Sequence, residues 1–157
     1  ILYHAERFEP GVKLLNNRLR LSVNGELSRR GAYEALLVNH EGFITEGSRS
    51  NIFFITPEGK IHTAPDKMVL SGITRRYVTD IIRNAGIPLV YEAVRESDTA
   101  TFRSAFITGT SPMVLPVCRI EDRQYYAADP LIERLRTIYS ELVERNMNDY
   151  KKVYEAD

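Results

Sequence analysis

The chain has 157 residues, of which 43% are apolar and 27% charged, so it is long enough for one globular domain with a hydrophobic core. Its 21 Lys and Arg residues balance 21 Asp and Glu residues, which argues against a protein that binds nucleic acid by neutralising phosphates. A single cysteine, Cys118, fits a reducing, cytoplasmic location, and the lack of a run of about 18 apolar residues argues against a membrane-spanning helix.

The first half of the chain reads as a strand, a helix and a series of hairpins. We expect, in chain order, a strand over 1–8, a break at Pro10-Gly11, and a helix over most of 14–31 with an interruption at Asn24-Gly25 and an end near Gly31. The hairpins comprise a buried strand over 32–39, a turn at His40-Glu41-Gly42 continued by Phe43 to Thr45, and strands over 51–56 and 60–64 around a Pro-Glu-Gly turn.

The second half adds two helices with strands between them. The first repeats apolar residues at helical spacing and is closed by Gly86; its apolar residues are Ile73, Tyr77, Val78, Ile81 and Ile82. Strands follow over 87–94, 104–109 and 114–120, and Cys118 in the last of these is predicted to be a small core residue. A long amphipathic helix begins with Pro130 in its first turn and reaches about Tyr150, with one face made of Leu131, Leu135, Ile138 and Leu142.

Strands and helices do not alternate regularly, which predicts a mixed α/β fold and not a doubly wound parallel sheet. The chain contains no dinucleotide-binding, P-loop or hydrolase-elbow motif. His4, His40 and His62 lack the spacing of metal ligands, so we expect surface or strand histidines. The chain starts without Met and in the middle of a predicted strand, and we therefore expect it to be one domain of a longer protein.

Candidate ligand-binding residues lie in turns that are rich in Gly, Ser or Thr. Gly72, Ile73 and Thr74 open a predicted helix, where free backbone N–H groups attract a phosphate. The alternative is that Ser71 or Thr74 only caps this helix, and the local sequence favours the cap. The turn over 109–112, with Thr110 and Ser111, either binds an anion or is a plain turn.

Two charged residues have the same ambiguity. Glu46 either faces a cation or a protonated ring nitrogen, or is a solvated turn carboxylate. Lys13 either provides a desolvated, reactive amine or is a solvated charge. For each of these features taken singly, the plain alternative is the commoner one.

In combination, the same stretches resemble the signature of the class IV (fold type IV) aminotransferases, which use pyridoxal phosphate. The matching order is Glu46, Gly, Ser, two residues, then Asn-Ile-Phe, followed by Ile-His-Thr over 61–63 and Leu-Ser-Gly-Ile-Thr-Arg over 70–75. The resemblance covers nearly the whole chain, from VKLLN (12–16) through EALLVNHEGFITEGSRSNIFF (34–54) to FITGTSPMVLPV (106–117). It implies the pseudo-barrel fold of the larger domain of this family.

The resemblance also implies roles for individual residues. Lys13 matches the lysine that binds pyridoxal phosphate covalently, and Glu46 matches the glutamate that meets the pyridine nitrogen and keeps it protonated. Leu70 would lie near one face of the ring. Gly72, Ile73 and Thr74 match a phosphate-binding helix start, and Thr110 and Ser111 match a turn used for the phosphate and for the substrate carboxylate.

The family includes branched-chain and D-amino acid aminotransferases and aminodeoxychorismate lyase. We therefore expect transamination between an amino acid and a 2-oxo acid in a homodimer, with formation of 4-aminobenzoate by a lyase as the alternative. Arg18 stands where branched-chain enzymes carry a tyrosine, and the family's small N-terminal domain has no counterpart in this chain. A third alternative, a cofactor-free α/β binding module, requires neither Lys13 nor Glu46.

Overall fold

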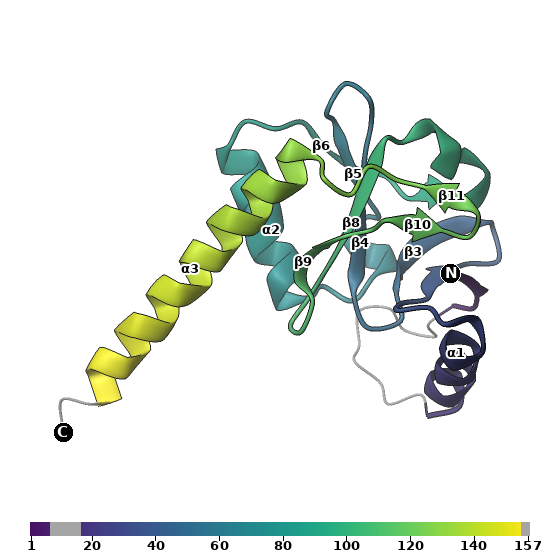
Figure 1. The fold of residues 1–157 in the computed structure, drawn as a ribbon, viewed down its shortest axis with the longest axis horizontal. Coiled ribbons are helices and arrows are strands. Elements are labelled where there is room, and N and C mark those ends of the chain that lie inside the picture. The colour runs from purple at the N-terminus through teal and green to yellow at the C-terminus, as the bar shows by residue number, and fades with distance from the viewer. Residues whose placement is uncertain (7–16, 155–157) are drawn as a thin grey trace.

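The computed structural model describes residues 1–6 and 17–154, which form a mixed α/β fold with three α-helices and two main sheets (Figure 1). The helices are α1 (Asn17–Arg30), α2 (Ile73–Asn84) and α3 (Pro130–Tyr154), with short 3₁₀ helices η1 (Asp66–Met68) and η2 (Glu96–Thr101). The strands are β1 (Leu2–His4), β2 (Leu36–Val38), β3 (Phe43–Gly47), β4 (Asn51–Ile55), β5 (Ile61–Thr63), β6 (Leu89–Tyr91), β7 (Val94–Arg95), β8 (Ser104–Gly109), β9 (Met113–Pro116), β10 (Arg119–Ile120) and β11 (Arg123–Gln124). The predicted mixed α/β fold is confirmed.

The two main sheets share one hydrophobic core. One sheet has the strand order β1-β2-β3-β7 and the other β6-β5-β4-β8-β9, while β10 and β11 form a separate ribbon. β1 pairs with β2 and β5 with β6 in parallel, and the other described pairs are antiparallel. The core takes buried side chains from both sheets, including Leu36, Val38, Ile44, Ile52, Phe54, Ala105 and Ile107. This arrangement agrees with the pseudo-barrel that the family resemblance implies.

Strand β4 explains why the Ile-Phe-Phe-Ile run over 52–55 is apolar without alternation. Successive side chains of a strand point to opposite faces of the sheet. Ile52 and Phe54 face the core between the sheets, whereas Phe53 and Ile55 face the helices α2 and α3. Both faces of this strand are therefore buried, and Phe53 stacks on Phe106 of β8 with ring centroids 4.8 Å apart.

Helices α2 and α3 cover the outer face of the five-stranded sheet (Figure 1). The fully buried stripe of α3 consists of Ile132 and Leu135, and Tyr139 continues it. Of the predicted apolar face, Leu135 is fully buried and Leu131 packs against the same core while partly buried, whereas Ile132 and Tyr139 take the buried positions predicted for Ile138 and Leu142.

Helix α2 shows a similar difference. Val78 and Ile82 are fully buried against the sheet, as predicted. Ile73 and Tyr77, which share the same helical spacing, are instead 69% and 38% exposed. The helix contacts the sheet through a narrower stripe than periodicity predicted, and Ile73 stands at the exposed start of the helix.

Helix α1 packs on the other side of the molecule, through Val23 and Leu27 against Ala35. The expected interruption at Asn24-Gly25 is absent, because the helix is continuous over Asn17–Arg30 and a side chain at Gly25 would meet nothing within 4 Å. Gly31 ends the helix with a φ of 60°, as predicted. The part of the expected helix over 14–16 lies outside the described residues.

Two predicted strands are each split by the structure. The segment 87–94 contributes β6 to the five-stranded sheet and leads into β7 of the four-stranded sheet. The segment 114–120 contributes β9 and then β10, and Cys118 lies exposed between them. The prediction of Cys118 as a core residue is therefore wrong, because the chain leaves the sheet before it reaches this position.

The histidines lie on strands and at a turn, as predicted. His4 of β1 pairs with Glu96 at 3.1 Å, and His40 in the turn before β3 pairs with Glu6 at 2.7 Å. A hydrogen bond with Glu6 raises the pKa of His40, whereas burial lowers the pKa of His62 in β5. Among residues 1–6 and 17–154 no group of acidic, His or Cys side chains is arranged to hold a metal ion.

Candidate functional site

The predicted motif over 45–51 forms the connection by which the chain passes from one sheet to the other. Glu46 lies near the end of β3, and Asn51 is the first residue of β4. The turn between them is closed by a hydrogen bond of 2.7 Å from the Gly47 N–H to the Ser50 carbonyl. The two polar side chains therefore stand at the two ends of one tight turn.

Glu46 is buried, with only 2% of its surface exposed. One of its carboxylate oxygens, Oε2, accepts a hydrogen bond of 3.2 Å from the backbone N–H of Leu70. A buried carboxylate is costly unless polar partners surround it. The alternative of a solvated turn carboxylate is therefore wrong for this residue.

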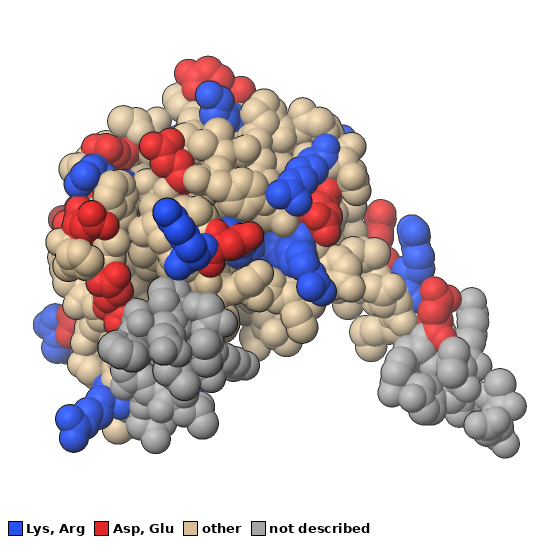
Figure 2. All heavy atoms as spheres, turned by 180° about the vertical axis from the view of Figure 1, so that it is seen from behind, with Lys and Arg blue, Asp and Glu red and all other residues tan. Residues whose placement is uncertain are grey.

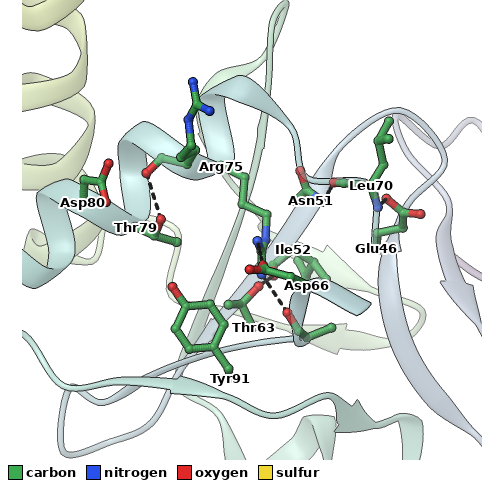
Figure 3. A network of polar contacts seen from close by, with 12 residues as sticks. Glu46, Asn51, Ile52, Thr63, Asp66, Leu70, Arg75, Thr79, Asp80 and Tyr91 are labelled. Atoms are coloured by element: carbon green, nitrogen blue, oxygen red, sulfur yellow. Dashed lines mark hydrogen bonds and ion pairs between the residues drawn. The ribbon is translucent and has the colours of Figure 1, made fainter. Parts of the chain in front are cut away.

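Asn51 also binds the backbone of Leu70, at its carbonyl group (Figure 3). Its Nδ2 donates a hydrogen bond of 2.9 Å to the Leu70 carbonyl, and the side chain is buried. The backbone N–H and C=O of Leu70 are thus both held by side chains from the two ends of the 47–50 turn. This fixes the segment that leads directly into α2.

Helix α2 begins next to this segment. Gly72 is its N-cap residue, and a Cβ atom at Gly72 would lie 2.8 Å from Oδ1 of Asn51. The cap makes no side-chain hydrogen bond, so the prediction that Ser71 or Thr74 caps the helix is wrong. The Thr74 hydroxyl instead accepts a hydrogen bond of 3.3 Å from the Tyr139 hydroxyl of α3. By helix geometry, the first backbone N–H groups of α2 have no intrahelical partner and form the positive end of its dipole.

A buried arginine anchors the start of α2 to the preceding loop. Arg75 is 3% exposed, forms an ion pair with Asp66 and donates a hydrogen bond of 2.7 Å to the Ala64 carbonyl. Its guanidinium also lies 5.7 Å from the centre of the Tyr91 ring (Figure 3). The loop over 64–72 is therefore held at its beginning by Arg75 and at Leu70 by Glu46 and Asn51.

The predicted turn over 109–112 lies beside the 47–50 turn. Asn51 is paired with Thr108 across β4 and β8. A Cβ atom at Gly109 would be 3.1 Å from the Pro112 ring and 3.3 Å from the Arg49 carbonyl, so the two turns touch at their backbones. The Thr108 hydroxyl is buried and has no hydrogen-bond partner among the described residues.

The structure thus brings together three of the four stretches that the sequence singled out. Glu46, Leu70 and Gly72 are joined by direct contacts, and Ile73 and Thr74 continue from them. Thr110 and Ser111 lie exposed in the adjoining 109–112 turn. Lys13, the predicted catalytic residue, lies outside the described residues, and its placement stays a prediction.

Sequence reasoning missed the side chains that hold these turns. Arg75 and Asn51 stood inside the recognised motifs, but local spacing gave no sign of what they bind. Glu34 is the first residue of the matching stretch over 34–54, which predicted no role for it. Its carboxylate accepts hydrogen bonds from the turn after Gly47. Each of these contacts joins residues that are at least nine positions apart. A short sequence motif therefore does not indicate which distant residue each side chain contacts.

Comparison with known proteins gives the same family. The model of "Amino-transferase class IV" matches residues 1–120. A "Probable branched-chain-amino-acid aminotransferase" of Aquifex aeolicus is 33% identical over 138 residues, which are 83% of this chain and 44% of that protein. The "Branched-chain-amino-acid aminotransferase" of Pseudomonas aeruginosa is 34% identical over 115 residues, covering 72% of this chain and 37% of that protein.

A solved structure agrees in its three-dimensional fold. The branched-chain amino acid aminotransferase of Thermobaculum terrenum, in its PLP-form, superposes with a TM-score of 0.81 at 29% identity, over 90% of this chain and 50% of that one. The chain spans less than half the length of the two curated relatives named above. A family model that matches most of the chain, together with sequence relatives above 30% identity, shows that the chain belongs to the class IV aminotransferase family.

Proposed function

We propose that this chain is the large, cofactor-binding domain of an enzyme that uses pyridoxal phosphate to transfer an amino group between an amino acid and a 2-oxo acid. The proposal rests on the two hydrogen bonds by which Glu46 and Asn51 fix the backbone N–H and C=O of Leu70. These bonds place a buried carboxylate directly beside the backbone that opens α2. A carboxylate and a helix N-terminus side by side suit a ligand with a cationic ring and a phosphate.

The described residues fit such a ligand at its phosphate end. Gly72 and Gly109 both stand where a Cβ atom would crowd neighbouring atoms, so both positions let a backbone approach closely. The Thr108 hydroxyl, in the residue before Gly109, is buried and has no hydrogen-bond partner in the part of the chain that the structure describes. Free backbone N–H groups at the start of α2 add hydrogen-bond donors for an anion.

Each proposed site residue has a separate task. Pyridoxal phosphate supplies an electron sink for the carbon next to the amino group. The Lys13 amine would bind the cofactor covalently and, once released, move a proton between carbon atoms. Glu46 would keep the ring nitrogen protonated, and Thr110 and Ser111 would hold the phosphate and the substrate carboxylate.

The relatives favour transamination over the lyase reaction. The curated relatives are named as branched-chain and D-alanine aminotransferases. The structural neighbour titled as a putative lyase is 19% identical and supports the fold alone. Amino transfer that requires a 2-oxo acid would identify a transaminase, whereas release of pyruvate without an acceptor would identify the lyase.

The covalent site is tested by chemical reduction. The intact protein is incubated with pyridoxal phosphate, treated with borohydride and digested for mass spectrometry. We expect one pyridoxyl adduct, on Lys13, and its loss in a Lys13→Ala variant. A protein that takes up no cofactor, or an adduct on another lysine, would contradict the proposed function.

Gly72→Ala is expected to weaken cofactor binding by about tenfold, which corresponds to ~1.4 kcal/mol. The added Cβ would meet the Asn51 oxygen at 2.8 Å, and Asn51 cannot move aside without losing its bond to Leu70. Absorbance titration with pyridoxal phosphate measures the change. Gly25→Ala is the control, because its Cβ would meet open space in α1 and the substitution favours the helix. Equal affinities of the two variants would argue against the tight helix start as the phosphate site.

The proposal also covers the oligomeric state, the location and the partners of the enzyme. We propose a homodimer in the cytoplasm, with small-molecule substrates and a further domain that completes the site. Lys and Arg side chains stand beside Asp and Glu side chains on the face shown in Figure 2. Elsewhere in the described structure, ion pairs such as Arg29–Glu26 and Arg30–Glu121 join opposite charges. Such mixed charge suits a protein that does not bind nucleic acid. Within the described part of the chain, no helix has the length and apolar character needed to cross a membrane.

A further inference from the structure

The carboxylate of Glu34 accepts four hydrogen bonds. Oε1 accepts from the Ala35 N–H at 2.8 Å and from the Ser48 hydroxyl at 2.6 Å. Oε2 accepts from the Ser50 hydroxyl at 2.9 Å and from the Arg49 N–H at 3.3 Å. Glu34 lies just before β2, whereas three of its donors belong to the turn that connects β3 to β4.

This turn carries the two side chains that define the candidate site. Glu46 precedes it and Asn51 follows it, and both hold Leu70. The turn is also tightly packed on Glu34, because a Cβ at Gly47 would lie 2.1 Å from the Ser50 hydroxyl and 3.2 Å from Cγ and Cδ of Glu34. Any movement of residues 48–50 would therefore change how Glu46 and Asn51 stand relative to Leu70.

We propose that Glu34 is a positioning residue for the cofactor site: its carboxylate fixes the 48–50 turn and thereby sets the placement of Glu46 and Asn51. The inference rests on the proposed function for the identity of the ligand. Glu34 has no direct contact with Leu70 in the described contacts, and it acts through the turn.

The hydrogen-bond pattern makes Glu34→Gln a specific probe. Each carboxylate oxygen serves one backbone N–H and one serine hydroxyl. A hydroxyl can rotate and accept from an amide NH₂, but a backbone N–H can only donate. In either orientation, the glutamine therefore leaves the N–H of Ala35 or of Arg49 facing another donor. The substitution disturbs the turn while it preserves the size of the side chain.

The first test measures amide hydrogen exchange by NMR without cofactor. In Glu34→Gln we expect the Arg49 and Leu70 amides to exchange at least about tenfold faster, while amides of β8 keep their wild-type rates. Ser50→Ala removes one donor, keeps the carboxylate, and is expected to give a smaller change at the same amides. Glu133→Gln is the matched control, since Glu133 is bonded to Arg136 on α3, away from the turn. Unchanged exchange at Arg49 and Leu70, or an equal rise in β8, would overturn the positioning role.

The second test links the turn to the cofactor. We expect Glu34→Gln to raise the Kd for pyridoxal phosphate by about tenfold and to alter the visible circular dichroism of the bound cofactor, with Glu133→Gln unchanged. If the wild-type protein binds pyridoxal phosphate and Glu34→Gln binds it with the same Kd and spectrum, the positioning role is wrong and the proposed function stands. If the wild-type protein binds none, the proposed function fails, and with it the role of Glu34 toward this ligand.

Discussion

Glu46→Gln is expected to lower kcat by about 100-fold, the order of loss for one preorganised electrostatic group in an active site. The glutamine oxygen can still accept the hydrogen bond from the Leu70 N–H, so the local structure should be retained. A neutral amide, however, does not stabilise a positive charge on a ring nitrogen as a carboxylate does. The cofactor should therefore remain bound while turnover slows.

Steady-state kinetics and the visible spectrum of the bound cofactor measure this effect. Glu92→Gln is a suitable control, because Glu92 is an exposed residue between β6 and β7. We expect the control to keep wild-type turnover. A Glu46→Gln enzyme with wild-type kcat would remove Glu46 from its proposed role, even if pyridoxal phosphate is shown to be the cofactor.

Asp129→Ala is expected to lower the free energy of unfolding by about 3 kcal/mol, because it removes a buried carboxylate that accepts hydrogen bonds from Ser104 and from the partly exposed Arg103, and because it removes a helix cap. The Asp129 carboxylate is fully buried and accepts hydrogen bonds from the Ser104 hydroxyl at 2.6 Å, from Arg103 Nε at 2.8 Å, and from the Leu131 N–H at 2.9 Å. It thus joins β8 to the first turn of α3. Urea unfolding followed by circular dichroism measures the loss.

The same carboxylate gives the stability a defined dependence on pH. Burial by itself would raise the pKa of Asp129, but the hydrogen bonds from Ser104, Arg103 and Leu131 outweigh it and leave the pKa below its ordinary value of 3.8. A lowered folded-state pKa means that the contribution is complete above the unfolded-state pKa and is lost as the pH falls through the folded-state value. The wild type should therefore exceed Asp129→Ala by a constant margin from pH 7 to about 5, and the margin should shrink below about pH 4.

Asp80→Ala is the control for this experiment, because Asp80 is exposed and its contact with Arg83 is long, at 3.5 Å. Such surface pairs contribute little, so we expect a change within about 0.5 kcal/mol. If Asp129→Ala were no less stable than Asp80→Ala, the hydrogen bonds around Asp129 would not be what fixes α3 to the sheet.

Several features of the site followed from the sequence because they depend on short segments. The order and spacing of Glu46, Asn51 and the LSGITR stretch were enough to indicate the family, which the comparisons confirm. Gly72 at a helix start and the 109–112 turn could be nominated because both stretches are rich in Gly, Ser or Thr, whereas the close approach of other atoms to Gly72 and Gly109 is a finding of the structure. The apolar run of β4 and the glycine end of α1 were predictable for similarly local reasons.

Other features required the assembled fold. The local sequence allowed a serine or threonine cap on α2, but Thr74 points to Tyr139, which lies 65 residues further along the chain. Cys118 has apolar neighbours in sequence, yet it is exposed because β9 ends before it and β10 begins after it. Periodicity predicted Ile138 for the buried face of α3, where packing against the sheet selected Tyr139.

The sequence by itself determined the family, the mixed α/β class and the residues nominated for the site, because these depend on residue types at short, regular spacing. Only the tertiary structure decided that Glu34 holds the 48–50 turn, and that Glu46 and Asn51 on either side of this turn both hold Leu70. A hydrogen bond requires two groups within about 3 Å, and which distant residues meet at that distance is set by how the two sheets and their connecting turns pack together.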